Sequence, residues 1–210
     1  MKEALRLVAI TDNLRDGQEG LAGRVSAAAR GGATMIQVRL KHATGRELVE
    51  VTRALVQAVS VPVVVNDRVD VAIAAGAAGV HLGVQDLPVA AARHLAPPGF
   101  IIGASLGDVL EQPTTEGADY VGVGPIFPTP TKSDAGNAIG VSGMTSLLAL
   151  SSRPAVAIGG VTAANAGEIV RAGAAGVAVI SAIFGADDPE LAARELRQAI
   201  DRAFGQTVRS

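Results

Sequence analysis

Short apolar runs alternate with alanine-rich segments of helical pattern along the chain. Most of the runs are continuously apolar, which is typical of parallel strands covered on both faces. They fall at 7–11, 35–40, 62–66, 79–83, 100–105, 120–124, 155–159 and 176–181. The segments between them predict helices at 20–32, 44–59, 69–77, 87–96, 143–151, 162–174 and 189–205. The remaining connection, 108–117, contains Pro113 and predicts only a short helix.

This alternation predicts an α/β protein, a single (β/α)8 TIM barrel over residues 1–210. Eight strands in 210 residues leave about 26 residues per unit, close to the compact limit of this architecture. The fragments GGATMIQV, AGAAGVHL, EGADYVGV and AGAAGVAV repeat one pattern, in which glycine and alanine end a helix before a strand. A doubly wound open sheet is the competing fold, but no G-x-G-x-x-G motif follows the first strand. No linker marks a second domain.

Composition narrows the class of protein. Aromatic residues make up 2% of the chain and the net charge is -2, so neither a base-stacking platform nor a basic footprint for nucleic acid is present. The absence of cysteine excludes disulfides, thiolate metal sites and a cysteine nucleophile. No apolar run is long enough to span a membrane, and the N-terminus lacks the pattern of a signal peptide. We therefore expect a soluble cytoplasmic protein with no membrane or nucleic-acid partner; a homo-oligomer stays open.

In a barrel of this kind, the active site lies at the carboxyl ends of the strands. The second strand ends in QVRLK, where Gln37, Arg39 and Lys41 alternate and are expected to share one face. Such a row can receive an anion, because a guanidinium binds phosphate oxygens through two hydrogen bonds. An equally open alternative is a solvated strand end whose cations pair with helical carboxylates.

Two carboxylates, Asp67 and Asp86, follow the third and fourth strands. Opposite a basic row they suit Mg²⁺, which is commonly held by one or two carboxylates together with substrate phosphates and water. The alternative is that each carboxylate caps the helix that follows it. Ser105, at the end of the fifth strand, either donates a hydrogen bond to a phosphate or begins a turn. His81 is expected to be a satisfied core residue, and none of the three histidines is a candidate catalytic base.

The stretch GPIFPTPTK, 124–132, begins as a strand and continues into a loop without periodic pattern from Phe127 to about Ser142. A loop of this length in a compact domain is usually functional or disordered, and its two prolines argue against disorder near its root. Its threonines and Lys132 are candidate donors to an anion, with a rigid surface connection as the alternative. Gly159-Gly160 and Ile180-Ser181 end the last two strands, where barrels often bind phosphate through backbone N–H groups.

Five segments together resemble thiamine-phosphate synthases: QVRLK, VPVVVNDRVDVAIAAGAAGVHLGVQDLP, GADYVGVGPIFPTPTK, VAIGGVTAAN and GVAVISAIF. They occur in that family's order and cover nearly the whole chain. The family is a (β/α)8 barrel that joins 4-amino-5-hydroxymethyl-2-methylpyrimidine diphosphate to a hydroxyethylthiazole or carboxythiazole phosphate. Diphosphate leaves first, and the thiazole nitrogen then attacks the cationic methylene carbon.

The resemblance implies a role for each matched residue. Asp67 and Asp86 would hold Mg²⁺, and the catalytic set would be Arg39, Lys132 and Ser105. The pyrimidine diphosphate would contact Gln37, Val38, Arg39, Leu40, Lys41, Asn66, Ser105 and Lys132. The thiazole phosphate would contact Thr129, Pro130, Thr131, Gly160, Ile180 and Ser181.

Two alternatives stay open. A thiazole tautomerase shares the fold and the thiazole phosphate site but catalyses no coupling, and it has no evident need for Asp67, Asp86 or Lys132. A non-catalytic paralogue that binds thiamine precursors is supported only by the altered segment Leu-Gly-Asp after Ser105.

Overall fold

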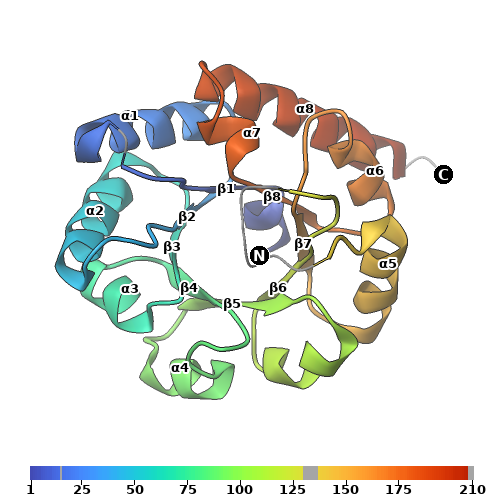
Figure 1. The fold of residues 1–210 in the computed structure, drawn as a ribbon, viewed down its shortest axis with the longest axis horizontal. Helices are drawn as coiled ribbons and strands as arrows, with labels where there is room; N and C mark the ends of the chain where they lie inside the picture. Colours follow the sequence, from blue (N-terminus) through green and yellow to red (C-terminus); the bar gives the residue numbers. More distant parts are fainter. Residues whose placement is uncertain (15, 130–136, 208–210) are drawn as a thin grey trace.

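A closed barrel of parallel strands forms the centre of the protein. The structure is a computed structural model that describes residues 1–14, 16–129 and 137–207. Each strand pairs with the next along the chain and β8 pairs with β1, so the ladder has no edge (Figure 1). The predicted (β/α)8 fold is confirmed. The strands are β1 (Leu7–Ile10), β2 (Met35–Val38), β3 (Val63–Asn66), β4 (Gly79–Leu82), β5 (Ile101–Leu106), β6 (Tyr120–Val123), β7 (Ala155–Ile158) and β8 (Gly176–Val179).

Helices form an outer ring around the strands (Figure 1). The helices are η1 (Lys2–Leu5), α1 (Gly17–Arg30), α2 (Gly45–Ala58), α3 (Val69–Ala75), α4 (Val89–Leu95), η2 (Val109–Thr115), α5 (Gly140–Leu150), α6 (Ala166–Arg171), α7 (Ser181–Phe184) and α8 (Pro189–Thr207). The short helix predicted around Pro113 is the 3₁₀ helix η2. The sequence pattern did not indicate η1 or α7, and it placed the start of α5 three residues too late. None of the helices in the described ranges is both long and apolar enough to cross a membrane.

Apolar side chains form two cores, one on each side of the strand ladder. The larger core lies between the strands and the helices and contains nearly all of the buried valine, leucine and alanine. The smaller core fills the barrel interior with residues such as Val8, Met35 and Val64. Leu5, fully buried on η1, belongs to the inner core, and η1 lies across the middle of the strand ring in Figure 1. Burial on both faces explains why the strands read as continuous apolar runs.

The two AGAAGV repeats have a common steric basis. Gly79 and Gly176 are the first residues of β4 and β8. A Cβ atom at Gly79 would overlap the carbonyl oxygen of Ile101, and one at Gly176 would overlap that of Leu5. The neighbouring chain segment approaches too closely in both places for any side chain, so these strands must begin with glycine.

We therefore expect Gly79→Ala to lower the free energy of unfolding by about 1–3 kcal/mol, because a backbone carbonyl cannot rotate away from the added methyl group as a side chain would. Gly23→Ala is the matched control. Gly23 is exposed in the interior of α1, and a Cβ atom there would meet nothing within 4 Å. The control should raise the free energy of unfolding by about 0.5–1 kcal/mol. Urea denaturation measures both values, and equal stability of the two variants would contradict the steric explanation.

Candidate active site

Two adjoining cavities open at the carboxyl ends of the strands. The larger, about 440 Å³, is lined from all sides of the barrel. The smaller, about 80 Å³, lies against the segments that follow β6, β7 and β8. Gly124, Ile158, Ala178 and Ile180 line both cavities. Ligands in the two cavities would therefore lie next to each other across a shared apolar wall.

The wall of the larger cavity is polar on one side and apolar on the other. Side chains from β2 to β5 supply the polar side: Gln37, Asn66, His81 and Ser105. Side chains from β1, β7 and β8 supply the apolar side: Val8, Ile10, Val156, Ile158 and Ala178. Such a cavity orients a ligand that carries both an apolar ring and polar substituents.

The row predicted from QVRLK reaches the larger cavity. Gln37, Arg39 and Lys41 all line it, as their alternation predicted. The side chains of Val38 and Leu40 instead belong to the core between strands and helices. The side chain of Gln37, almost completely buried, donates through Nε2 to Oδ1 of Asn66 at 3.2 Å. This hydrogen bond ties the ends of β2 and β3 together.

Thr11 fixes the backbone of Arg39 just beyond the end of β2. Its hydroxyl, fully buried, accepts a hydrogen bond from the Arg39 N–H at 2.8 Å and donates to the Arg39 carbonyl oxygen at 3.2 Å. The Thr11 N–H also donates to the Gln37 carbonyl oxygen at 2.9 Å. One side chain thus extends the ladder between β1 and β2 past its last backbone pair. Sequence reasoning did not single out Thr11, because its contact depends on the register of two strands.

Asp67 and Asp86 line the same cavity as the basic row. The alternative in which they cap helices is wrong, because the N-cap residues of α3 and α4 are Arg68 and Pro88. Asp86 accepts through Oδ2 from the N–H of Gly83 at 2.7 Å, which holds its carboxylate against the loop. Asp67 has φ 65°, and it is the only non-glycine residue with positive φ in the part of the chain that the structure describes.

That backbone conformation is costly for most side chains, and residues of this kind cluster at functional sites. Asparagine and aspartate tolerate it better than other residues. Within residues 1–14, 16–129 and 137–207, no three His, Cys, Asp or Glu side chains gather as a potential metal site. The protein thus supplies a pair of carboxylates here.

Ser105 lies inside β5, which continues to Leu106, so it does not begin a turn. Its hydroxyl lies 3.2 Å from Nε2 of His81, and Nδ1 of His81 lies 3.1 Å from the hydroxyl of Tyr120. His81 is satisfied on both ring nitrogens, as expected, but it lines the larger cavity and is only partly buried. Burial raises the pKa of the Tyr120 hydroxyl far above its ordinary value, so this group stays protonated. No pattern in the sequence singled out Tyr120.

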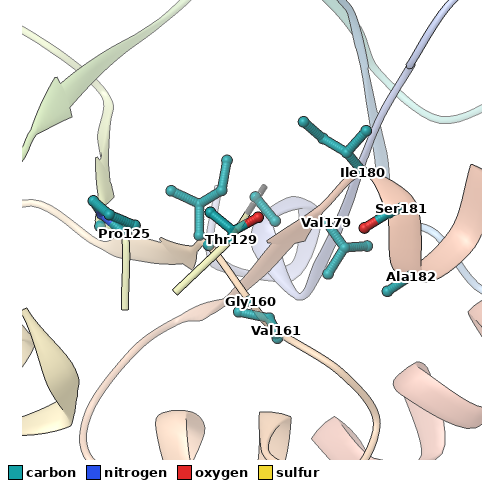
Figure 2. Close-up of a pocket in the computed structure, with 12 residues that line it drawn as sticks. Pro125, Thr129, Gly160, Val161, Val179, Ile180, Ser181 and Ala182 are labelled. Carbon is teal, nitrogen blue, oxygen red and sulfur yellow. The ribbon is translucent and has the colours of Figure 1, made fainter. Parts of the chain in front are cut away.

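The smaller cavity is built by loops that hydrogen bonds hold in place. The N–H groups of Ile126 and Phe127 donate to the carbonyl oxygens of Ile158 and Gly159 at 2.9 and 3.0 Å. The root of the long loop after β6 is therefore ordered against the end of β7, as its prolines suggested. Figure 2 shows the hydroxyl oxygens of Thr129 and Ser181 on facing sides of this cavity.

Gly160 forms the floor between them, and it has a positive φ of 63°. A Cβ atom there would lie 2.6 Å from Cβ of Phe127, so glycine is required for the loop to pack. Ile180 and Ser181 join β8 directly to the short helix α7 and also line the cavity. The structure thus brings together Thr129, Gly160, Ile180 and Ser181. The other predicted loop residues, Pro130, Thr131 and Lys132, lie outside the described residues.

Comparisons with known proteins show the family to which this chain belongs. A family model described as thiamine monophosphate synthase matches residues 7–183. This chain belongs to that family. A thiamine-phosphate synthase of Methanoculleus marisnigri is 50% identical over 181 residues, covering 84% of this chain and 86% of the relative. One from Xanthobacter autotrophicus is 47% identical over 201 residues, covering 93% of this chain and 95% of the relative.

A solved structure is also similar to this protein in three dimensions. The thiamine phosphate pyrophosphorylase from Pyrococcus furiosus superposes with a TM-score of 0.86 and 40% sequence identity. The match covers 97% of this chain and 99% of that chain. Relatives with these names favour the coupling reaction over a tautomerase or a non-catalytic paralogue.

We expect Thr11→Val to raise the KM for the pyrimidine diphosphate about fivefold, the effect of about 1 kcal/mol from one lost hydrogen-bonding partner. The reason is that the Arg39 N–H and carbonyl lose the hydroxyl that fixes them. Thr11→Ser keeps the hydroxyl and should restore the KM. Steady-state kinetics and hydrogen exchange of the Arg39 amide measure the two effects.

The matched control is Thr52→Val. Thr52 is also fully buried, on α2, but its hydroxyl has no hydrogen-bond partner in the described part of the chain. Its replacement should leave the KM unchanged and should not lower stability, because no hydrogen bond is lost. An equal rise in KM in both variants would show that Thr11 acts only through general stability.

Proposed function

We propose that this protein is a thiamine-phosphate synthase: a transferase that condenses 4-amino-5-hydroxymethyl-2-methylpyrimidine diphosphate with a hydroxyethylthiazole or carboxythiazole phosphate. The products are thiamine phosphate and diphosphate, and a carboxythiazole phosphate would also release its carboxyl group as carbon dioxide. The observation that carries the proposal is the pair of adjoining cavities with a shared wall. One cavity has a basic row and two carboxylates, and the other has a glycine floor between two hydroxyls. Two substrates that must react with each other need such an arrangement.

The larger cavity would take the pyrimidine diphosphate. Its polar side offers amides and hydroxyls to the ring substituents, and its apolar side suits the ring face. Arg39 and Lys41 would bind the diphosphate, with Lys132 added from the loop beyond Thr129. Val38 and Leu40 would contact the ligand through their backbone, because their side chains pack in the core.

The smaller cavity would take the thiazole phosphate. Thr129 and Ser181 carry hydroxyls on its facing sides (Figure 2), and Gly160 also lines it. Backbone N–H groups of the segments after β7 and β8 would donate to phosphate oxygens. Ile180, with Pro130 and Thr131 from the loop, would complete this site. Because Ile180 also lines the larger cavity, the thiazole ring would face the pyrimidine methylene group.

The charges in the larger cavity support a requirement for Mg²⁺. Among the described residues that line it, two are basic, Arg39 and Lys41, and three are acidic, Asp67, Asp86 and Glu111. Lys132 from the loop would only balance these charges, so the negative charge of an incoming diphosphate would stay uncompensated without a cation. Asp67 and Asp86 offer the oxygen ligands that Mg²⁺ prefers, and substrate oxygens with water would complete the octahedron. Glu111 is engaged elsewhere, accepting from the Gly107 N–H at 2.6 Å.

The reaction would break the C–O bond between the methylene carbon and the diphosphate, and the electron pair would leave with the diphosphate. The thiazole nitrogen lone pair would then form the C–N bond. Arg39 and Lys132 would stabilise the charge that develops on the leaving group, which is the interaction that accelerates such a step. Bound Mg²⁺ would neutralise part of the same charge. We place this activity in the cytoplasm, since a chain without cysteine fits a reducing compartment and its relatives are named thiamine-phosphate synthases.

The direct experiment incubates the protein with both substrates and Mg²⁺ and measures thiamine phosphate by chromatography. Product is expected only when both substrates are present. Failure to form it, with the thiazole phosphate alone converted to a tautomer, would support the tautomerase instead. Binding of both substrates without turnover would support the non-catalytic paralogue.

We expect Asp67→Asn and Asp86→Asn each to lower turnover about a hundredfold or more, the scale for losing one preorganised electrostatic contribution. Asparagine removes the charge but tolerates the positive φ of Asp67 and keeps an oxygen for the Gly83 N–H. Asp70→Asn is the matched control, because Asp70 is exposed on α3 and pairs with Arg68 outside the cavity. Full activity in excess chelator would contradict the metal assignment.

A further inference from the structure

Three neighbouring strands carry a chain of hydrogen bonds into the larger cavity. It runs from the Tyr120 hydroxyl on β6 to His81 on β4 and then to the Ser105 hydroxyl on β5. The two links measure 3.1 and 3.2 Å. Tyr120 is only 2% exposed, whereas His81 and Ser105 are partly exposed to the cavity. These hydrogen bonds therefore connect the buried Tyr120 hydroxyl to the Ser105 hydroxyl, which a ligand can reach.

Two glycines inside the strands leave space for the side chains of Tyr120 and His81. In the strand register, Gly103 of β5 lies between His81 and Tyr120. A Cβ atom at Gly103 would overlap the Tyr120 ring, so its absence lets the tyrosine reach across β5 to the histidine. A Cβ atom at Gly122 would lie 3.0 Å from Cε1 of His81. Glycine weakens a strand interior, and both positions are explained by the approach of these two rings.

The burial of Tyr120 determines which group donates in each of these two hydrogen bonds. Its hydroxyl must stay protonated, and a buried donor without an acceptor is costly. The acceptor that the structure offers is Nδ1 of His81. His81 is then neutral and carries its proton on Nε2, since a neutral imidazole has one donor and one acceptor nitrogen. Nε2–H donates to Oγ of Ser105, and this leaves the hydroxyl hydrogen of Ser105 to point elsewhere.

We propose that Tyr120 is a positioning residue that sets the tautomer of His81 and thereby makes Ser105 a hydrogen-bond donor toward the larger cavity. In the other tautomer, with the proton of His81 on Nδ1, the Tyr120 hydroxyl would be buried without an acceptor. The Ser105 hydroxyl would then donate to Nε2 of His81 and could not donate to a ligand. A serine held as a donor selects a ligand atom that accepts, such as an oxygen of the pyrimidine diphosphate or a ring nitrogen. The identity of this ligand rests on the proposed function; the tautomer does not.

The tautomer is tested on the protein without ligand. Imidazole ¹⁵N NMR should show His81 as the Nε2–H tautomer in the unaltered protein. In Tyr120→Phe this preference should be lost, because Nδ1 no longer receives a hydrogen bond. His42 and His94 are exposed and serve as internal controls whose signals stay unchanged. An Nδ1–H tautomer in the unaltered protein would overturn the proposal.

A double-mutant cycle tests the effect on the ligand. Tyr120→Phe should raise the dissociation constant of the pyrimidine diphosphate about three- to tenfold, the range for one misdirected hydrogen bond. The affinity for the thiazole phosphate should not change, because Tyr120, His81 and Ser105 do not line the smaller cavity. In a Ser105→Ala background, Tyr120→Phe should have no further effect on the dissociation constant, since its influence passes through the serine.

The outcomes separate the inference from the proposed function. If Tyr120→Phe weakens binding equally with and without Ser105, the tyrosine acts through general packing and the proposal is wrong. If the unaltered protein forms no thiamine phosphate, the proposed function fails while the NMR result still decides the tautomer. Thermal denaturation of each variant shows whether a loss of binding merely follows a loss of fold.

Discussion

The hydrogen bonds between β1 and β8 are the constraint on which the rest of this structure depends. They hold Leu7, Val8 and Ala9 in register with Val177, Ala178 and Val179, so the first and last strands become neighbours. Only this closure brings the polar ends of β2 to β5 opposite the loops after β7 and β8. An open sheet with the same strands would separate the basic row from the glycine floor at Gly160. Closure also removes both sheet edges, so all backbone groups of the strand ladder can find partners.

The division of the barrel mouth into unlike halves follows from this geometry. On β2 to β5 the inward positions nearest the mouth carry amide, imidazole and hydroxyl groups, while on β7 and β8 they carry aliphatic side chains. Deeper in the barrel, residues such as Met35 and Val64 restore an apolar interior. Each of the polar groups on β2 to β5 can hydrogen-bond to a neighbour or to a ligand. Gln37 with Asn66 and His81 with Ser105 are two such pairs.

The sequence predicted the fold and many of the residues that line the two cavities, because both depend on local pattern. Continuous apolar runs located every strand to within two residues at each end, and alternation placed Gln37 and Arg39 on one face. What it could not predict depends on register between strands. The contact of Thr11 with Arg39 and the reach of Tyr120 to His81 join residues 28 and 39 positions apart. The glycines at 103 and 122 were visible signals of such a close approach, but the pattern does not say which rings fill the space.

The wall that both cavities share has a consequence for molecules other than the substrates. Ile158, Ala178 and Ile180 separate the two sites by the width of side chains only. A single molecule with an anionic group at each end and a short, stiff linker could rest on this wall and occupy both sites at once. Its second group would bind at a high effective concentration, so its affinity would exceed that of either half alone. In this respect the barrel mouth is a bivalent receptor whose spacing the protein itself sets.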